Sequence, residues 1–527
     1  MTDTVSMSPP PSPKTPSPEG LTKSAGLVSG MTLLSRILGV VRDMVIANFF
    51  GASAGADSFF LAFKIPNFFR RLFGEGAFSQ AFVPVLSQYR TEKSHGEVRG
   101  LVAAIGGSLG INLLILTVLG VIGAPLVIGL FAAGFVYGGE TEKLNLATEM
   151  LRLTFPYVFL ICMTAFAGSV LNSYGRFGPP AFTPVLLNVC LISAAMVITP
   201  YMETPVVALA WGVLFAGVLQ LLFQFPFLAR EGLLVPPKVQ FSHPGVKRVM
   251  TLMLPALLGV SVGQINLLLD TVLASFLPTG SISWLYYSDR LLELPLALFG
   301  ITIATVILPS LSRQQAAEPE AFQETLAWAV KMVFLIGVPA SVALVVLSES
   351  LITTLFYQGE LTQRDVHMAG ASLAAYGIGL LGHMLVKVLA PGYFSRQDTK
   401  TPVRFGIMTL IANMVLNLIL VWHFKHVGLA LATSLAAFLN AGLLWFGLVR
   451  AGHFQIPTGW WLFLARLFIA NGAMLWFLLW CLPDQTGWFG MDFWARLGWM
   501  LAICVGGAVV YAASLTALGI KLKELIK

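Results

Sequence analysis

Charged residues are scarce in this sequence: Asp, Glu, Lys and Arg make up 11% of its 527 residues, against about 25% in a soluble globular chain. It has only four cysteines, none in a CxxC spacing, so neither a disulfide framework nor a cysteine-based zinc site is indicated. Its seven histidines form no HExxH motif, and no GxxxxGKS/T loop occurs, so a zincin helix and a P-loop are both excluded. Apolar residues, by contrast, make up 57% of the chain, and the mean hydropathy is +0.81. The sequence therefore indicates a polytopic membrane protein.

One glycine motif, Gly377-Ile-Gly379-Leu-Leu-Gly382, has the spacing of a dinucleotide-binding loop. It lies in an apolar helical run with no strand before it, so helix packing is its expected role. No basic patch is interleaved with aromatic residues in the manner of a nucleic-acid-binding surface. We therefore expect neither a nucleotide cofactor nor a nucleic-acid partner.

The first 20 residues, MTDTVSMSPPPSPKTPSPEG, are polar and rich in proline and serine. A segment of this composition cannot bury enough apolar surface to fold, so we expect a disordered cytoplasmic tail. The apolar run that follows is long enough to cross a bilayer, so we expect no removable signal peptide.

Apolar runs of about 20 residues, the length that crosses a bilayer as a helix, recur along the rest of the chain. They predict an all-α fold with fourteen transmembrane helices, the second of them short and amphipathic, and a further helical piece at 78–90. The expected spans are 25–50, 55–73, 98–123, 147–172, 181–200, 206–229, 246–276, 281–312, 323–347, 366–394, 402–424, 427–449, 459–482 and 493–519.

The loops between these spans differ in their content of basic residues. Eighteen Lys and Arg residues lie in one set of loops and in the two terminal segments, whereas the alternate set contains only Lys143, Arg364 and Lys425. Because basic loops stay on the cytoplasmic side, both termini are expected to be cytoplasmic.

The chain also contains an internal repeat. Tyr157 and Tyr174 lie 17 residues apart, and so do Tyr376 and Tyr393, with an offset of about 220 residues between the two pairs. Each half has six spans, so the two lobes share one orientation and are expected to face each other across a central space. The expected domains are a tail at 1–20, an N-lobe at 21–235, a C-lobe at 236–455, and helices 13 and 14 with the C-terminus at 456–527.

Several charged residues fall inside the expected spans. The stretch SRILGVVRDMVIANFF, residues 35–50, contains Arg36, Arg42 and Asp43, and a charge at the centre of a spanning helix costs about 3 kcal/mol. Three others, Lys331, Arg466 and Arg496, lie near expected helix ends, where their long side chains are expected to reach the interface.

The cations of helices 1, 2 and 8 need a different explanation. Arg36 and Asp43 are seven residues apart, on one helix face, and could simply pair. The nearby acids, however, would neutralise most but not all of these cations. A water-filled cavity between the lobes, lined by arginines, would satisfy them. The planar guanidinium suits phosphate oxygens bidentately, so we expect a phosphate- or pyrophosphate-containing substrate.

Three stretches, SRILGVVRD, GADSFFLAFKIPNFFRRLFGEGAFSQAFVPVLSQYR and SWLYYSDRLLELP, resemble the signature segments of the MurJ (MviN) family. These are lipid II flippases of the multidrug/oligosaccharidyl-lipid/polysaccharide exporter superfamily. The resemblance implies a transporter, not an enzyme. It would move undecaprenyl-pyrophosphate-linked disaccharide-pentapeptide from the inner to the outer leaflet of the bacterial inner membrane by alternating access, for peptidoglycan biosynthesis.

The same resemblance implies substrate-binding residues and partners. The positions that match the family's functional residues, or lie in the same motif, are Arg36, Arg42, Asp57, Lys64, Arg70, Arg71, Glu75, Arg290 and Glu293. Lipid II and membrane lipids are the implied partners, together with the peptidoglycan synthesis machinery. Helices 13 and 14 are candidates for a groove that guides the polyprenyl tail, or they serve only to pack against the C-lobe.

Two other functions fit the same fold class. One is a cation-coupled exporter of drugs or of another lipid-linked oligosaccharide, which would need acids in its cavity to bind a cationic drug. The other is a membrane scaffold for envelope synthesis. Only a flippase would change the leaflet in which a labelled lipid-linked precursor resides.

A coupling-ion site is a further candidate, since family members are described with sodium in the C-lobe. Asp270 lies deep in helix 7, Asn413 and Asn417 share a face of helix 11, and Thr433 lies in helix 12. Their oxygens are hard ligands that suit a small cation. The alternative is that Asp270 pairs with a base or is protonated, while the asparagines bond between helices. No other cofactor is expected.

Overall fold

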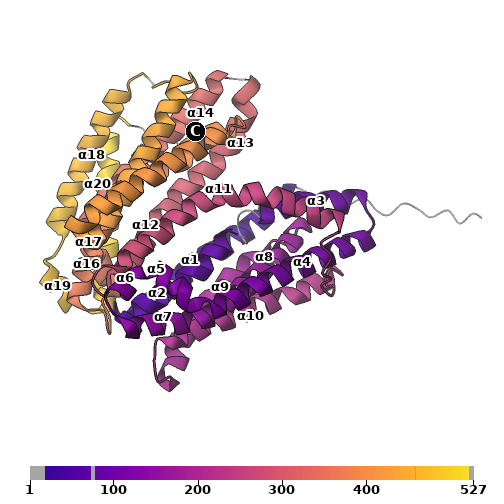
Figure 1. Cartoon of the computed structure of the whole chain (residues 1–527). Coiled ribbons are helices and arrows are strands. Elements are labelled where there is room, and N and C mark those ends of the chain that lie inside the picture. Colours follow the sequence, from indigo (N-terminus) through magenta and orange to yellow (C-terminus); the bar gives the residue numbers. More distant parts are fainter. Residues whose placement is uncertain (1–17, 73–77, 318, 457, 521–527) are drawn as a thin grey trace, which may run out of the picture.

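The computed structural model describes residues 18–72, 78–317, 319–456 and 458–520, and these ranges contain helices and no strand. Most of the expected tail and Glu75 therefore lie outside the described residues. The helices form two bundles that meet at one end and diverge toward the other, so that the molecule is V-shaped (Figure 1).

The first bundle contains the helices of the N-terminal half. They are α1 (Pro18–Phe50), α2 (Ala54–Phe69), α3 (Phe78–Glu92), α4 (His95–Ile122), α5 (Ala124–Phe131), α6 (Ala133–Tyr137), α7 (Thr141–Thr154), α8 (Pro156–Ser173), α9 (Gly178–Ser193) and α10 (Val207–Arg230). The piece expected at 78–90 is α3, which packs against α4, α8 and α11.

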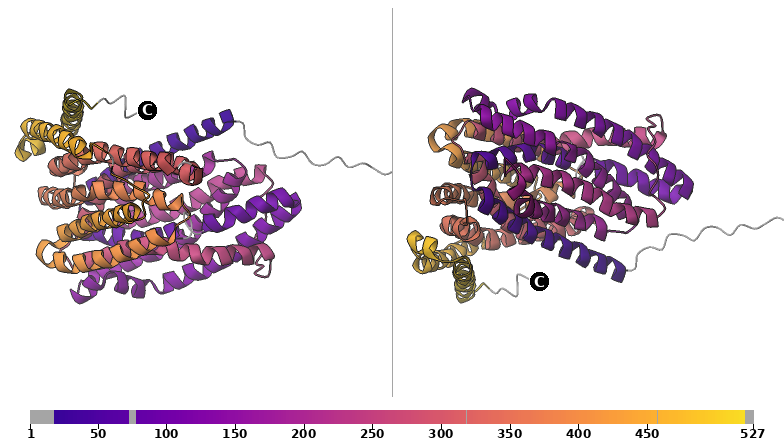
Figure 2. Two further views of the ribbon diagram at one scale, coloured as in Figure 1. Left: turned by 90° about the horizontal axis from the view of Figure 1, so that it is seen from above. Right: turned by 90° about the horizontal axis from the view of Figure 1, so that it is seen from below.

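The second half begins with a long helix that runs from α3 to α6 of the first bundle. Its helices are α11 (Pro244–Ser275), α12 (Ser281–Pro295), α13 (Thr302–Ala317), α14 (Pro319–Val346), α15 (Ser348–Phe356), α16 (Gln363–Phe394), α17 (Lys400–Arg450), α18 (Trp460–Cys481), α19 (Gln485–Gly490) and α20 (Phe493–Ala517). Helices α18 and α20 lie at the outer edge of the second bundle in Figure 1 and in both views of Figure 2.

The end at which the bundles meet is called the closed end below. Here the backbone N–H of Glu360 donates to the carbonyl of Asn48 at 3.0 Å, and the Tyr287 hydroxyl donates to the carbonyl of Gly51 at 2.8 Å. Gly51 has a φ of +57°, a conformation that favours glycine in the turn between α1 and α2. Helices α1, α2 and α12 are therefore fixed to one another at this end.

Ten helical stretches among the described residues are long and apolar enough to cross a membrane. Within the described residues, each of the fourteen expected spans falls on helix. The all-α class is therefore confirmed, while the number of crossings stays a prediction. The spans expected at 402–424 and 427–449 are two helical segments that α17 joins. They meet at a kink at Lys425, whose φ of 52° and ψ of −130° are not helical.

Two expectations about individual residues can be decided from packing. A Cβ on Gly379 would lie 2.6 Å from the Cα of Ser434, and one on Gly382 would lie 2.9 Å from the backbone nitrogen of Phe438. These glycines let α16 approach α17 closely, so the helix-packing interpretation of the glycine motif is confirmed.

The expectation for Arg496 was wrong. Its side chain does not reach out to the interface but is buried, with 5% of the residue exposed. Its guanidinium donates to the carbonyls of Thr353 and Tyr357, each at 3.0 Å. The Thr353 carbonyl also accepts from the backbone N–H of Tyr357 at 3.2 Å, and Arg496 of α20 adds a charged donor to both carbonyls at the end of α15.

Candidate substrate cavity

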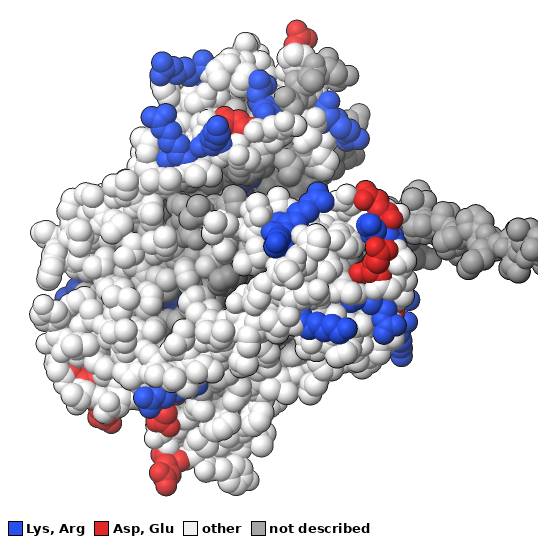
Figure 3. All heavy atoms as spheres, turned by 45° about the vertical axis from the view of Figure 1, so that its right-hand side comes forward, with Lys and Arg blue, Asp and Glu red and all other residues white. Residues whose placement is uncertain are grey.

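A cavity of about 880 Å³ lies between the two bundles. Most of its wall is built by α1, α2, α8, α9 and α10 of the first bundle and by α11 and α12 of the second, with single residues from α3, α15, α16 and α17. The space-filling view shows the gap between the bundles, with Lys and Arg side chains on both sides of its wide end (Figure 3).

The charges that line this cavity do not balance. Six cationic residues and four acidic residues are among the lining residues. The cations are Arg36, Arg42, Lys64, Arg70, Arg71 and Arg290, and the acids are Asp43, Asp270, Asp289 and Glu293. The lining therefore has a formal excess of two positive charges in a region that an anion can enter.

Arg42 is the most completely bonded of these cations. It is 6% exposed, and its Nε and Nη2 donate to Oδ1 of Asp43 at 2.9 and 2.6 Å. Its Nη1 donates to Asn188 of α9 at 3.0 Å, and its Nη2 also donates to the Tyr286 hydroxyl of α12 at 3.0 Å. The guanidinium is thus fixed from three helices.

The Asp43 carboxylate lies between the arginines of the two bundles. Its Oδ1 accepts from Arg42 and from the Tyr286 hydroxyl, the latter at 2.9 Å, and its Oδ2 is 3.5 Å from Nε of Arg290. Asp43 is 1% exposed. Pairing of Asp43 with Arg36, which the sequence left open, is not what the structure shows.

Arg290 retains donor capacity despite its ion pairs. Its Nη1 donates to Glu293 at 2.8 Å, and its Cζ lies 5.0 Å above the centre of the Tyr286 ring. Its Nε is buried and has no hydrogen-bond partner among the described residues. A buried donor without a partner is costly, so this N–H is available to an acceptor that enters the cavity.

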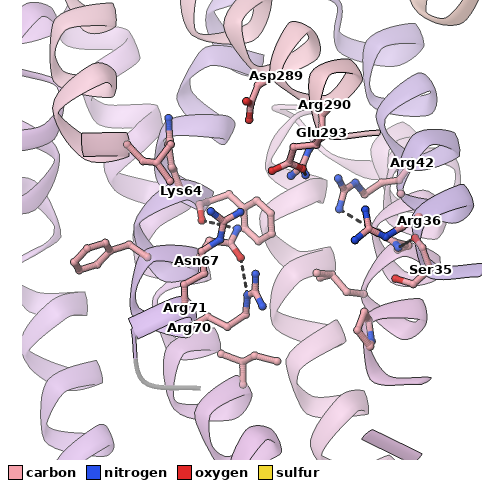
Figure 4. A pocket seen from close by; sticks show the side chains of 18 of the residues that line it. Ser35, Arg36, Arg42, Lys64, Asn67, Arg70, Arg71, Asp289, Arg290 and Glu293 are labelled. Carbon is pink, nitrogen blue, oxygen red and sulfur yellow. Dashed lines mark hydrogen bonds and ion pairs between the residues drawn. The ribbon is translucent and has the colours of Figure 1, made fainter. Parts of the chain in front are cut away.

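Helix α2 contributes a second group of cations (Figure 4). Nε of Arg70 donates to Oδ1 of Asn67 at 3.1 Å, and Lys64 and Arg71 lie on the same side of the helix. Lys64, Arg71 and also Arg36 of α1 make no hydrogen bond or ion pair with any residue in the ranges that the structure describes. Lys64 still interacts electrostatically with Asp270 and Asp289, but the N–H groups of all three side chains have the capacity to donate to an anion.

Asp57, which the resemblance assigns to the substrate site, lies at the closed end and does not line the cavity. Its Oδ2 accepts from the backbone N–H of Gly280 at 2.7 Å, and its Oδ1 accepts from the N–H and hydroxyl of Ser283 at 2.9 and 2.6 Å. It thus caps the first turn of α12 from the other bundle. In this conformation Asp57 connects the bundles.

The expected ion-site residues come together in part. The amide of Asn417 donates to Oδ1 of Asp270 at 2.7 Å, and Thr433 lines the cavity beside Asp270 and donates to the carbonyl of Leu429. The Oδ1 atoms of Asn413 and Asn417 are buried and unpartnered within the described ranges. Among the same residues no group of three or more His, Cys, Asp or Glu side chains could bind a metal ion.

Sequence reasoning missed three contributors. Asp43 was expected to pair with Arg36 on the same helix face or to act as one of several nearby acids, and its contact with its chain neighbour Arg42 was not foreseen. Asn188 and Tyr286 carry no charge, and only the packing of α9 and α12 against α1 brings them to Arg42. The SWLYYSDRLLELP stretch that contains Tyr286 was the one available signal.

Known proteins resemble this chain over nearly all its length. Residues 46–497 match the family model described as Lipid II flippase MurJ. The chain is 50% identical over 513 residues to a Vibrio cholerae serotype O1 protein named probable lipid II flippase MurJ, with 96% of this chain and 97% of that protein covered.

Solved structures give the same result. The chain resembles a lipid II flippase MurJ in an inward closed conformation, with a TM-score of 0.80 and 28% identity, over 95% of this chain and 100% of that one. It also resembles an inward-facing multidrug resistance MATE family transporter of the MOP superfamily, with a TM-score of 0.65 and 15% identity, covering 81% and 98% of the two chains. The second likeness concerns the fold alone.

Proposed function

The chain belongs to the MurJ family of lipid II flippases, and we propose that its central cavity binds the pyrophosphate of lipid II between Arg42 and Arg290. It is a membrane transporter and not an enzyme, and its substrate is lipid II, the lipid-linked precursor of peptidoglycan.

One observation carries the proposal about the site: a single carboxylate, that of Asp43, lies between arginines from the two bundles. An anion position is therefore already built there. A pyrophosphate presents more acceptor oxygens and more charge than one carboxylate. It can offer a hydrogen bond to Nε of Arg290, which makes an ion pair with Asp43 at 3.5 Å but no hydrogen bond within the described residues, while engaging Arg42.

The nearby cations extend this site along the cavity. Arg36, Lys64, Arg70 and Arg71 line the same space, and three of them have no ion-pair partner among the described residues. We propose that they attract the headgroup and follow it as it moves, and that Glu293 sets the orientation of Arg290. For Asp57 we propose a different role, the closure of one end.

The excess of cations also bears on the alternative functions. An exporter of cationic drugs needs an excess of acids in its cavity, whereas six cations and four acids line this one. Two of the four acids, Asp43 and Glu293, are already paired with arginine. A scaffold for envelope synthesis needs no such cavity. Both observations support the flippase.

The direction of transport follows from orientation. We propose that both termini are cytoplasmic, in the bacterial inner membrane, because the wide end of the gap carries the Lys- and Arg-rich loops (Figure 3). The cavity then opens to the cytoplasm and is closed on the outer side by Asp57, Tyr287 and Glu360. Rocking of the lobes at 21–235 and 236–455 would expose the headgroup outside.

Two features outside the headgroup site complete the proposal. Helices α18 and α20, residues 456–527 of the expected division, lie at the edge of the second bundle, where a polyprenyl tail can lie along them in the lipid. Sodium is proposed as a coupling ion at Asp270, Asn413, Asn417 and Thr433, supported by the two buried, unpartnered amide oxygens. The peptidoglycan synthesis machinery is proposed to supply and consume the substrate.

Reconstitution tests the function directly. Purified protein in vesicles with fluorescent lipid II should make the label accessible in the opposite leaflet faster than empty vesicles do. Variants with both Arg42 and Arg290 replaced by Gln should not. Transport of the label by this double variant at the wild-type rate would overturn the pyrophosphate site.

A further inference from the structure

Part of the cavity wall carries no charge. All the lining residues contributed by α8, α9 and α10 are uncharged, in contrast to those from α1, α2 and α12. Several of them are nevertheless polar: Thr164, Ser169, Asn172, Thr183, Gln220 and Gln224. This surface offers hydrogen bonds but no counter-charge to an ionic ligand.

Gln224 is the unusual residue of this wall. It is 1% exposed, yet its Oε1 is buried and has no hydrogen-bond partner among the described residues. A buried carbonyl oxygen without a donor is destabilising, and such a group in a cavity wall indicates an acceptor position that a ligand can fill.

Small and rigid neighbours leave space beside this amide. A Cβ placed on Gly168 would lie 3.7 Å from Nε2 of Gln224 and 3.2 Å from Cβ of Pro180. Any larger residue at position 168 would therefore press on Pro180 and narrow the approach to the amide.

Gln220, one helical turn earlier, provides an internal comparison. It is also 1% exposed and lines the same cavity. Its Nε2 donates to the carbonyl of Thr183 at 2.7 Å, and its Oε1 accepts from the Tyr157 hydroxyl at 3.3 Å. Gln220 is thus satisfied by the protein, and Gln224 is not.

The two parts of the cavity lie at different depths. Helix α10 begins at the closed end, since a Cβ on Gly55 of α2 would lie 3.0 Å from Val206, whereas α1 ends there. At 1.5 Å per residue, Gln224 lies roughly 25 Å from the closed end and Arg42 roughly 12 Å. The amide is therefore nearer the wide end of the gap.

We propose that Gln224 is the centre of a sugar subsite, in which its carbonyl oxygen accepts a hydrogen bond from a hydroxyl or acetamido N–H of the headgroup. The inference rests on the proposed function, since it assumes a pyrophosphate held at Arg42 and Arg290. The uncharged wall selects the sugars rather than the carboxylates of the peptide. The headgroup then lies with its pyrophosphate deep in the cavity and its sugars toward the wide end.

A pair of isosteric variants tests this subsite. Gln224→Met removes the acceptor, and Gln220→Met removes two satisfied hydrogen bonds on the same helix face. Binding is measured with purified protein and two ligands, lipid II and undecaprenyl pyrophosphate without sugars. Gln224→Met should weaken lipid II binding about tenfold, the loss of one hydrogen bond of ordinary strength, and should leave the bare pyrophosphate lipid unaffected.

Thermal unfolding separates this role from a structural one. Gln224→Met loses no hydrogen bond within the protein and should unfold at the wild-type temperature or above it. Gln220→Met should unfold at a lower temperature and should reduce the affinity for both ligands to the same degree. The subsite would be overturned if Gln224→Met reduced the affinity for both ligands equally, or if it left the affinity for lipid II unchanged.

Arg42→Lys distinguishes failure of the subsite from failure of the pyrophosphate site. This variant should bind both ligands more weakly, because both contain the pyrophosphate. If Arg42→Lys has no effect on either ligand while Gln224→Met weakens lipid II selectively, the sugar subsite is supported and the pyrophosphate assignment is wrong.

Discussion

Replacing Arg42 or Arg290 with lysine keeps the charge and removes the planar fork of donors. Arg42 uses three nitrogens to reach Asp43, Asn188 and Tyr286 together, a geometry that one ammonium group cannot reproduce. Arg290 divides its nitrogens between Glu293 and the neighbourhood of Asp43. We therefore expect both single lysine variants to transport lipid II poorly.

The size of the effect follows from the bonds lost. A hydrogen bond to a charged group is worth about 1.5–3 kcal/mol, and about 1.4 kcal/mol corresponds to a tenfold change in affinity. Losing one such bond to the pyrophosphate should weaken binding about 10- to 100-fold. Arg42→Lys should also unfold at a lower temperature than Arg290→Lys, because only Arg42 is fully bonded within the protein.

The assay is complementation of a depleted strain at matched protein levels, together with flipping in vesicles. Arg176→Lys is a suitable control, since this arginine is exposed, pairs with Glu231 and does not line the cavity. Full rescue by both lysine variants would refute the proposal that Arg42 and Arg290 together bind the pyrophosphate. If Arg42→Lys alone failed, its contacts to Asn188 and Tyr286 would explain the defect without a shared site.

Three further predictions concern other parts of the cavity. A cysteine at Lys64 should react with a water-soluble reagent and one at Phe59, which is fully buried, should not; equal inertness would mean that α2 does not line an aqueous path. Asp57→Asn should open the closed end, because an amide cannot accept all three bonds from α12, and a cysteine at Ser281 should then be labelled faster; an unchanged rate would contradict this role. Sodium should accelerate flipping in the wild type and not in Asp270→Ala; indifference to sodium in both would exclude the ion site.

The positions of the helices could be predicted because each spanning helix must meet one requirement within one segment of sequence. A helix must be about 20 apolar residues long to cross a bilayer, so the runs in the sequence fall on helices throughout the described ranges. The repeated tyrosines indicated two similar halves, and Figure 1 shows two bundles. The break at Lys425 falls between two expected spans because two polar residues, Lys425 and His426, separate them.

The sequence predicted that cations line the cavity, but it did not predict which residues pair with them. Uncompensated arginines in apolar helices indicated an anion site, and six cations do line one space. Asp43, however, bonds to its chain neighbour Arg42 because the arginine side chain folds back on α1 to meet Tyr286 from the other bundle. The expectation for Arg496 was wrong for the same reason, since its acceptors are the carbonyls of another helix, α15, and of the residue that ends it.

If the pyrophosphate binds between Arg42 and Arg290 as proposed, Asp43 couples substrate binding to the conformation of the two bundles. Its contact with Arg290 exists only when α1 and α12 are close at the closed end, so it contributes to the stability of this state. A ligand can shift a conformational equilibrium only by binding one state more strongly than the other. A pyrophosphate that takes the place of Asp43 between Arg42 and Arg290 replaces one contact across the bundles with its own. The bundles stay together only if the contacts of the pyrophosphate to the two arginines are stronger than the contact that Asp43 gives up. The shared carboxylate thus sets the threshold that the substrate must exceed, and it does so with residues from both halves of the repeat.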